Sequence, residues 1–147
     1  MLKKPEEKAL CRIIDANINR AKEGLRVCEE VSRFVLENRA LASDFKKMRH
    51  AISSLSKKLP GQDSFIQYRD SRLDVGRKIY ANELIRASIK DILLANLQRS
   101  KESVRVLEEF SKLINRNIAL AFKQIRYNIY DIEKRTTRKL LALRSSR

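Results

Sequence analysis

An internal repeat limits the folds open to this chain of 147 residues. Residues 16–33 and 95–112 align without a gap, and ten of the 18 pairs are identical. A second similarity lies downstream, where Phe45-Lys-Lys-Met-Arg-His50 returns as Phe122-Lys-Gln-Ile-Arg-Tyr127. Repeated supersecondary units usually bury their apolar faces against one another. We therefore predict an all-α fold, in which a duplicated helical hairpin forms a bundle of four long helices.

Hydrophobic spacing predicts where these helices lie in a single domain spanning residues 1–147. The repeat halves are about residues 10–59 and 88–138, a loop spans 60–81, and a basic tail follows at 135–147. Ser88 with Asp91 three residues later is typical of a helix start. Two core seams are expected at alternating spacings of four and three: Leu41, Phe45, Met48, Ile52 and Leu55, then Ile118, Phe122, Ile125, Ile129 and Ile132.

The first repeat carries polar residues on its apolar face. At about 100° per residue, Asn17 lies near the middle of an apolar arc that runs from Ile14 to Phe34 and Val35, and Arg20 lies on its edge. Asn96 holds the position of Asn17 in the second copy. A buried amide is costly unless it is paired, so each asparagine is expected to meet a polar partner from another helix. Asparagines that only fix the helix register are the alternative.

The net charge of +15 favours a polyanionic or phosphate-bearing partner. A solvated basic surface explains the charge equally well. The few aromatic residues are not interleaved with basic ones, so the stacking pattern of single-strand nucleic-acid binders is missing. No apolar run exceeds five residues, so we expect no membrane span and a cytoplasmic protein. Cys11 and Cys28 are expected to be buried free thiols, about 25 Å apart on one helix.

The stretch from Gln62 to Ala81 is the only long irregular segment expected. Long loops in compact domains are usually functional or disordered. Apolar residues should anchor this one: Phe65, Ile66, Tyr68, Leu73 and Val75. Its carboxylates Asp70 and Asp74, beside Arg69 and Gly76, suit a Mg²⁺ ion with phosphate oxygens. The alternative is an Asp-rich turn in which the glycine supplies a positive φ.

Four arginines are expected at related positions along the edges of the core: Arg20, Arg99, Arg49 and Arg126. A guanidinium group is a rigid donor fork suited to phosphate. Glu23 and Glu102 could pair with these arginines or accept a hydroxyl proton. Arginine–glutamate pairs that only hold helices together are the alternative, and spacing does not choose between them.

The residues named so far occur together in a known family. The resemblance rests on five motifs: Arg12-Ile-Ile-Asp-Ala-Asn-Ile-Asn-Arg-Ala-Lys-Glu-Gly-Leu-Arg26, Met48-Arg-His50, Arg69-Asp-Ser with Asp74-Val-Gly76, Ala95-Asn96 with Arg99 and Glu102, and Arg126-Tyr127 with Tyr130-Asp131. They span about residues 10–134. The chain resembles the small all-helical hydroxymethylpyrimidine phosphate kinases of thiamine biosynthesis, a domain often fused ahead of thiamine-phosphate synthase. Ser71, Leu73 and Arg77 depart from the family's loop pattern.

The resemblance implies an ATP-dependent kinase that converts 4-amino-5-hydroxymethyl-2-methylpyrimidine phosphate to its diphosphate, with ATP and Mg²⁺ as cofactors. We expect Asp70, Asp74 and Glu23 to be catalytic, the two aspartates by holding Mg²⁺. Ten further residues are expected to bind substrate or phosphate: Asn17, Arg20, Arg49, His50, Arg69, Gly76, Asn96, Arg99, Glu102 and Arg126. A homo-oligomer and contact with a thiamine-phosphate synthase are the partners that we expect.

Two functions of other classes stay open. The charge favours a basic helical nucleic-acid-binding protein, whose affinity would fall steeply with salt. The departures in the loop favour a non-catalytic helical interaction module.

Overall fold

The computed structural model describes residues 1–78 and 80–146, so Ile79 of the expected loop and Arg147 of the expected basic tail lie outside the described residues. The described residues form five α-helices and two 3-10 helices, and no strand. The α-helices are α1 (Lys4–Phe34), α2 (Arg39–Lys57), α3 (Gln62–Tyr68), α4 (Ile89–Ser111) and α5 (Arg116–Ser145). The 3-10 helices are η1 (Val75–Arg77) and η2 (Ala81–Leu84). The predicted all-helical class is confirmed.

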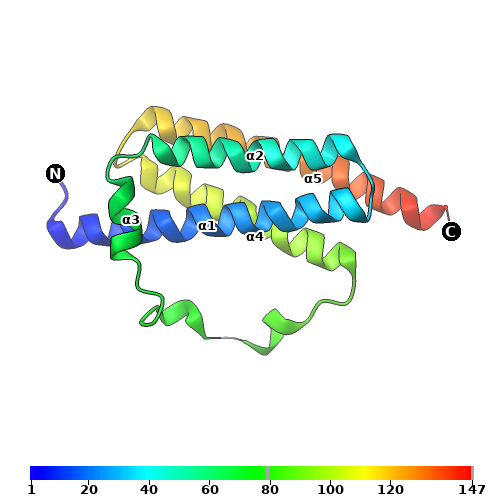
Figure 1. Ribbon diagram of the computed structural model, residues 1–147, viewed down its shortest axis with the longest axis horizontal. Coiled ribbons are helices and arrows are strands. Elements are labelled where there is room, and N and C mark those ends of the chain that lie inside the picture. Colours follow the sequence, from blue (N-terminus) through cyan, green and yellow to red (C-terminus); the bar gives the residue numbers. More distant parts are fainter. Residues whose placement is uncertain (79, 147) are drawn as a thin grey trace.

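The four long helices pack side by side, and each contacts two others. Helix α1 packs against α2 and α4, and α5 packs against α4 and α2 (Figure 1). The short α3 lies across the N-terminal half of α1 (Figure 1). All five α-helices contribute buried apolar side chains to one core. The paired repeat helices α1 and α4 are therefore in direct contact along the middle of the molecule.

The predicted core seams agree closely with the observed burial. All five predicted positions of α5 are buried, and so are four of the five in α2, where Leu55 is half-buried. The arc predicted in α1 is wrong at its end, because Phe34 is 64% exposed and Val35 is 37% exposed. Helix α1 ends at Phe34, four residues earlier than the predicted end near Asn38. Beyond this point the backbone turns away, with Glu37 at a φ of 49°.

The helix ends follow capping rules. The Ser88 hydroxyl accepts a hydrogen bond from the backbone amide of Asp91 at 3.2 Å, which confirms the predicted start of α4. Asn38 and Asn115 accept amide hydrogen bonds in the same way at the starts of α2 and α5. Gly61, the N-cap residue of α3, has a φ of 73°, a conformation that glycine adopts without steric cost.

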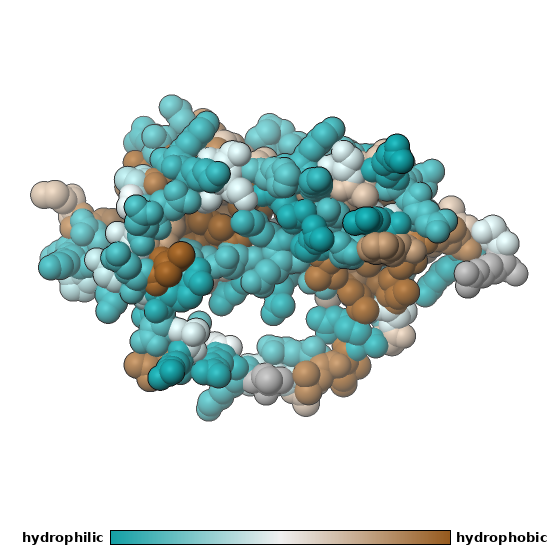
Figure 2. Space-filling view, in the orientation of Figure 1, coloured by the Kyte–Doolittle hydropathy of each residue, from teal (hydrophilic) through white to brown (hydrophobic). Residues whose placement is uncertain are grey.

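The segment between the halves differs from the predicted loop. It begins with helix α3, whose Phe65 is buried against the core. Three of the other predicted anchors are wrong, because Ile66, Leu73 and Val75 are 70%, 78% and 94% exposed. The fourth, Tyr68, is half-buried. The segment leaves the four long helices after α3, so its apolar residues have no core to enter (Figure 1). Figure 2 shows hydrophobic atoms on the surface of this segment.

None of the helices in residues 1–78 and 80–146 has the length and hydrophobicity needed to cross a membrane.

Candidate functional site

A cavity of about 660 Å³ lies between the N-terminal half of α1 and the segment that follows α3. Helix α1 supplies one wall through a run of residues spaced about one turn apart. The lining residues are Ala9, Arg12, Ile13, Asp15, Ala16, Asn17, Asn19, Arg20, Glu23, Arg69, Asp70, Ser71 and Asp74. Six of the predicted site residues are among them, namely Asn17, Arg20, Glu23, Arg69, Asp70 and Asp74. Residues from two distant parts of the sequence thus meet at one site.

A bidentate ion pair joins the two walls of the cavity. Arg69 donates from Nε to Asp15 Oδ2 at 2.7 Å and from Nη2 to Asp15 Oδ1 at 2.6 Å. Asp15 is only 8% exposed. The hydrogen bonds and the charge of Asp15 raise the pKa of Arg69. Arg69, which we predicted to bind substrate, is therefore engaged with α1 in this structure.

The two loop aspartates each cap a turn. Asp70 Oδ1 accepts a hydrogen bond from the amide of Leu73 at 3.2 Å, and Asp74 Oδ1 accepts one from the amide of Gly76 at 2.8 Å. Both residues also line the cavity. Gly76 lies just beyond it, lining an adjoining depression that shares Ser71 and Asp74 with the cavity. The carboxylates thus hold the loop's shape and face the same cavity as Arg12 and Arg20.

The cavity carries charge of both signs. Arg12 and Arg20 form no ion pair within the described residues. The carboxylates of Glu23, Asp70 and Asp74 share the lining with them. Guanidinium groups suit phosphate oxygens, whereas carboxylates suit a cation. The site therefore fits a phosphate ligand that brings a metal ion better than it fits a bare polyanion.

The donor set decides which kind of metal ion the site could hold. Across residues 1–78 and 80–146, no group of three or more His, Cys, Asp or Glu is arranged to hold a metal. Magnesium in phosphate-transfer sites usually takes one or two carboxylates and completes its shell with phosphates and water. Asp70 and Asp74 fit Mg²⁺ on those terms, and they do not fit a metal bound by protein alone.

The repeat asparagines do not pair across helices, and our prediction of an inter-helix partner is wrong. Asn17 Nδ2 donates to the carbonyl of Ile13 at 2.8 Å, and Asn96 Nδ2 donates to the carbonyl of Ile92 at 2.8 Å. Each amide thus uses one donor for a carbonyl one turn back on its own helix. Asn17 is buried and lines the cavity, whereas Asn96 is half-buried and does not line it.

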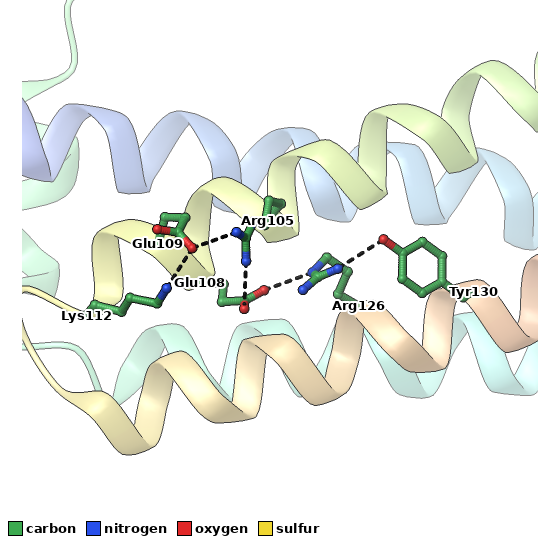
Figure 3. Close-up of polar contacts among 6 residues, drawn as sticks. All are labelled: Arg105, Glu108, Glu109, Lys112, Arg126 and Tyr130. Carbon is green, nitrogen blue, oxygen red and sulfur yellow. Dashed lines mark hydrogen bonds and ion pairs between the residues drawn. The ribbon is translucent and has the colours of Figure 1, made fainter.

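The second half has a shallow groove of its own at α4 and α5, with a volume of about 500 Å³. Glu102 and Arg126 line it, together with Gln98, Lys101, Arg105 and Tyr130. Arg126 donates to Glu108 at 2.8 Å and to the Tyr130 hydroxyl at 3.0 Å (Figure 3). These partners, Glu108 first, raise the pKa of Arg126. The cations of this groove are held by glutamates: Arg105 also pairs with Glu108, and Lys101 pairs with Glu133.

The remaining predicted residues lie outside the cavity lining. Arg49 contacts Glu29 through Nε at 2.7 Å and Nη2 at 2.6 Å, which favours the structural alternative for this arginine. His50 and Arg99 are exposed on α2 and α4. The structure therefore does not bring all four repeat arginines to one site, and only Arg20 lines the cavity.

A model of the ThiD2 family matches residues 12–135 of this chain. The chain belongs to the ThiD2 family. The matched region contains the whole α1 wall from Arg12 onward and the loop carboxylates. The cavity is thus part of the ThiD2 domain itself.

Curated relatives of this ThiD2 protein are longer. The chain is 44% identical over 126 residues to a thiamine-phosphate synthase of Synechocystis sp., covering 85% of this chain and 35% of that protein. It is 42% identical over 132 residues to a thiamine-phosphate synthase of Nostoc punctiforme, covering 89% and 36%. The chain therefore spans about a third of the relatives' length. No solved structure matched the chain.

Three polar side chains in the α1 wall of this ThiD2 domain's cavity were missed from the sequence. Arg12, Asp15 and Asn19 line the cavity, but none was singled out for a role there. Comparing the two repeats could have pointed to Arg12 and Asp15, because the second copy has different residues at these positions. Arg12 corresponds to Asp91, and Asp15 corresponds to Leu94. The charge at the position of Arg12 is reversed in the second half, and the carboxylate of Asp15 is replaced there by an apolar side chain.

Proposed function

We propose that this ThiD2 domain acts in thiamine biosynthesis and phosphorylates 4-amino-5-hydroxymethyl-2-methylpyrimidine phosphate with ATP to give the diphosphate. The family match and the names of the longer relatives support the pathway. The resemblance in the Asp-Ala-Asn to Gly-Leu-Arg string of α1 supports the reaction. Kinase chemistry also suits a site with unpaired arginines and carboxylates, because phosphoryl transfer depends chiefly on positioning and charge neutralisation.

One observation carries the proposal: Arg12 and Arg20 line the same cavity as Asp70 and Asp74, and among residues 1–78 and 80–146 neither arginine has an ion-pair partner. The two arginines are eight residues apart on one helix, or roughly 12 Å along its axis. A phosphorylated substrate and a nucleotide each bring phosphates to one site. Two separated guanidinium groups can hold the two ligands' phosphates at once.

The chain's residues have separate tasks in this reaction. Arg12 and Arg20 bind phosphate oxygens and neutralise charge that develops on them. Asn17 and Asn19 offer hydrogen bonds to the amino group and ring nitrogens of the pyrimidine. Glu23 accepts the proton of the substrate's phosphate hydroxyl while that oxygen forms a bond to the γ-phosphorus and the bond to ADP breaks. Mg²⁺, which Asp70 and Asp74 would hold, supplies further charge neutralisation at the nucleotide phosphates.

We also propose that the fold is a four-helix bundle made from a duplicated hairpin. The same interactions occur at equivalent repeat positions. Glu29 with Arg49 and Glu108 with Arg126 form corresponding ion pairs, and the two asparagine bonds also correspond. We propose in addition that the chain forms a homo-oligomer and that it contacts a thiamine-phosphate synthase.

The reaction is tested directly by ³¹P NMR of the purified chain with ATP, Mg²⁺ and the pyrimidine monophosphate. The proposal predicts that pyrimidine diphosphate and ADP appear together in equal amounts. The unphosphorylated pyrimidine alcohol, which lacks the phosphate that an arginine would hold, is the control and should react far more slowly. Absence of product, together with no rise in melting temperature on adding the substrates, would reject the kinase. Binding of nucleic acid at physiological salt would then favour the nucleic-acid alternative.

A further inference from the structure

The ion pair between Asp15 and Arg69 differs from the ion pairs that join the long helices of this chain. It joins residues 54 positions apart and connects α1 to the segment after α3. Its two hydrogen bonds run in parallel, a geometry that is stronger and more specific than a single charged bond. Asp15 is nearly buried, and a buried carboxylate that loses its partner is strongly unfavourable. The pair therefore fixes the position of Arg69 firmly.

The second half has no equivalent of this pair. Asp15 corresponds to Leu94, and the segment containing Arg69 has no repeat counterpart. By contrast, the pair of Glu29 with Arg49 recurs as Glu108 with Arg126. Packing of the long helices accounts for the pairs that recur. Two further pairs, Lys101 with Glu133 and Asp44 with Arg135, also lack a repeat counterpart, but each joins two long helices. The pair of Asp15 with Arg69 instead joins a long helix to the segment that lines the cavity.

The loop beyond Arg69 has little else to hold it in place. Every described side chain from Asp70 to Lys78 is exposed. The hydrogen bonds of Asp70 and Asp74 are internal to the loop, so they fix its shape without attaching it to a helix. The buried anchor Phe65 lies on α3, before the loop starts. Arg69 is thus the last residue before the two aspartates that is bound to α1.

We propose that Asp15 and Arg69 are positioning residues, which hold the loop so that Asp70 and Asp74 face Arg12 and Arg20 across the cavity. This rests on the proposed function for its effect on turnover, but its effect on the loop does not depend on any activity. Neither residue touches the reacting atoms in this account. Arg69 acts through its bond to Asp15 and is not a phosphate ligand.

The test uses the full chain with Asp15→Asn, Arg69→Gln and the double variant. Hydrogen exchange of peptides covering residues 66–78 reports loop attachment without any ligand, and should rise by about tenfold in all three variants. Turnover per folded molecule should fall by about 100-fold, because small displacements of catalytic groups are costly. The double variant should be no worse than either single variant. Asp44→Asn, which breaks the α2–α5 ion pair with Arg135, is the control and should change neither readout.

Each other result would overturn the proposal. Unchanged exchange with lost turnover would mean that the residues act on the ligand directly. Increased exchange with full turnover would mean that loop position does not matter to the reaction. Additive losses in the double variant would mean separate roles. If Asp15→Asn does not fold, Arg69→Gln gives the same exchange readout, since Arg69 is exposed. A wild-type chain without kinase activity rejects the proposed function, while the exchange measurement still decides whether the pair holds the loop.

Discussion

The Ser100 hydroxyl of α4 donates a hydrogen bond to the Ala21 carbonyl of α1 at 3.2 Å. These two residues occupy the same position in the repeat. Contact between equivalent positions is what a twofold relation between α1 and α4 would produce at its axis. Ser100 and Ala21 are fully buried, so the two helices are in close contact where both copies carry small side chains.

Gly24→Ala should destabilise the protein. A Cβ atom at Gly24 would contact the Ser100 hydroxyl and lie 2.8 Å from the backbone oxygen of Asn96, and the backbone cannot turn aside. Alanine gains about 1 kcal/mol in helix propensity, but overpacking costs about 1–3 kcal/mol. We expect a net loss of up to about 2 kcal/mol in urea unfolding. Ser103→Ala, at the equivalent position of α4, is the control and should be nearly neutral. A stabilised Gly24→Ala variant would show that the helices are not closely packed there.

Arg49→Met should lower stability and leave turnover per folded molecule unchanged. Glu29 would lose its closest partner while nearly buried, and breaking such a pair costs about 3 kcal/mol. Thermal unfolding and a steady-state assay on the folded fraction measure the two effects. Arg26→Met removes a more exposed partner of the same glutamate and should cost under about 1 kcal/mol. A turnover defect in a stable Arg49→Met protein would restore the phosphate role that the sequence predicted.

Arg20→Ala and Arg99→Ala should differ although the two arginines are repeat equivalents. Arg20 lines the cavity, and Arg99 is exposed on α4 away from it. Steady-state kinetics should show a loss of about 100-fold or more in kcat/KM for Arg20→Ala. Arg99→Ala should stay close to wild type. Equal losses would indicate that both halves bind phosphate.

Cys28 should make stability depend on alkaline pH. Burial, and then the charge of Glu133, raise the pKa of this thiol to about 12 from 9.0. The neutral thiol favours the folded state, so its contribution is complete below pH 9 and is lost as pH rises towards 12. Urea unfolding across this range should therefore show the stability of wild type falling more steeply than that of Cys28→Ala. Parallel curves would mean that the thiol is not desolvated.

The sequence was sufficient for the helices and their core, but not for the connection between the halves. Periodicity identified the seam of α5 correctly because each buried position depends on residues within a few turns. Ile66, Leu73 and Val75 follow no helical period, so hydrophobicity alone wrongly suggested that they were buried. Their exposure depends on where the segment runs in space.

The candidate site was predictable only in part for a related reason. Arg20 and Glu23 were found because they interrupt or flank a clear periodic pattern. The contact of Asp15 with Arg69 joins two residues 54 positions apart, and nothing local to either indicates the other. Asp15 also lies next to the apolar face, where a carboxylate is easily taken for a solvated residue.

The central claim is that the loop carboxylates serve a phosphoryl-transfer site, and the variants Asp70→Asn and Asp74→Asn test it most directly. Asparagine keeps the Oδ1 acceptor that caps the turns at Leu73 and Gly76, and it removes only the charge. The measurement pairs melting temperature with turnover at saturating ATP and Mg²⁺. Our account predicts an unchanged melting temperature and a loss in turnover of about 100-fold or more. Wild-type melting with wild-type turnover in both variants would contradict it.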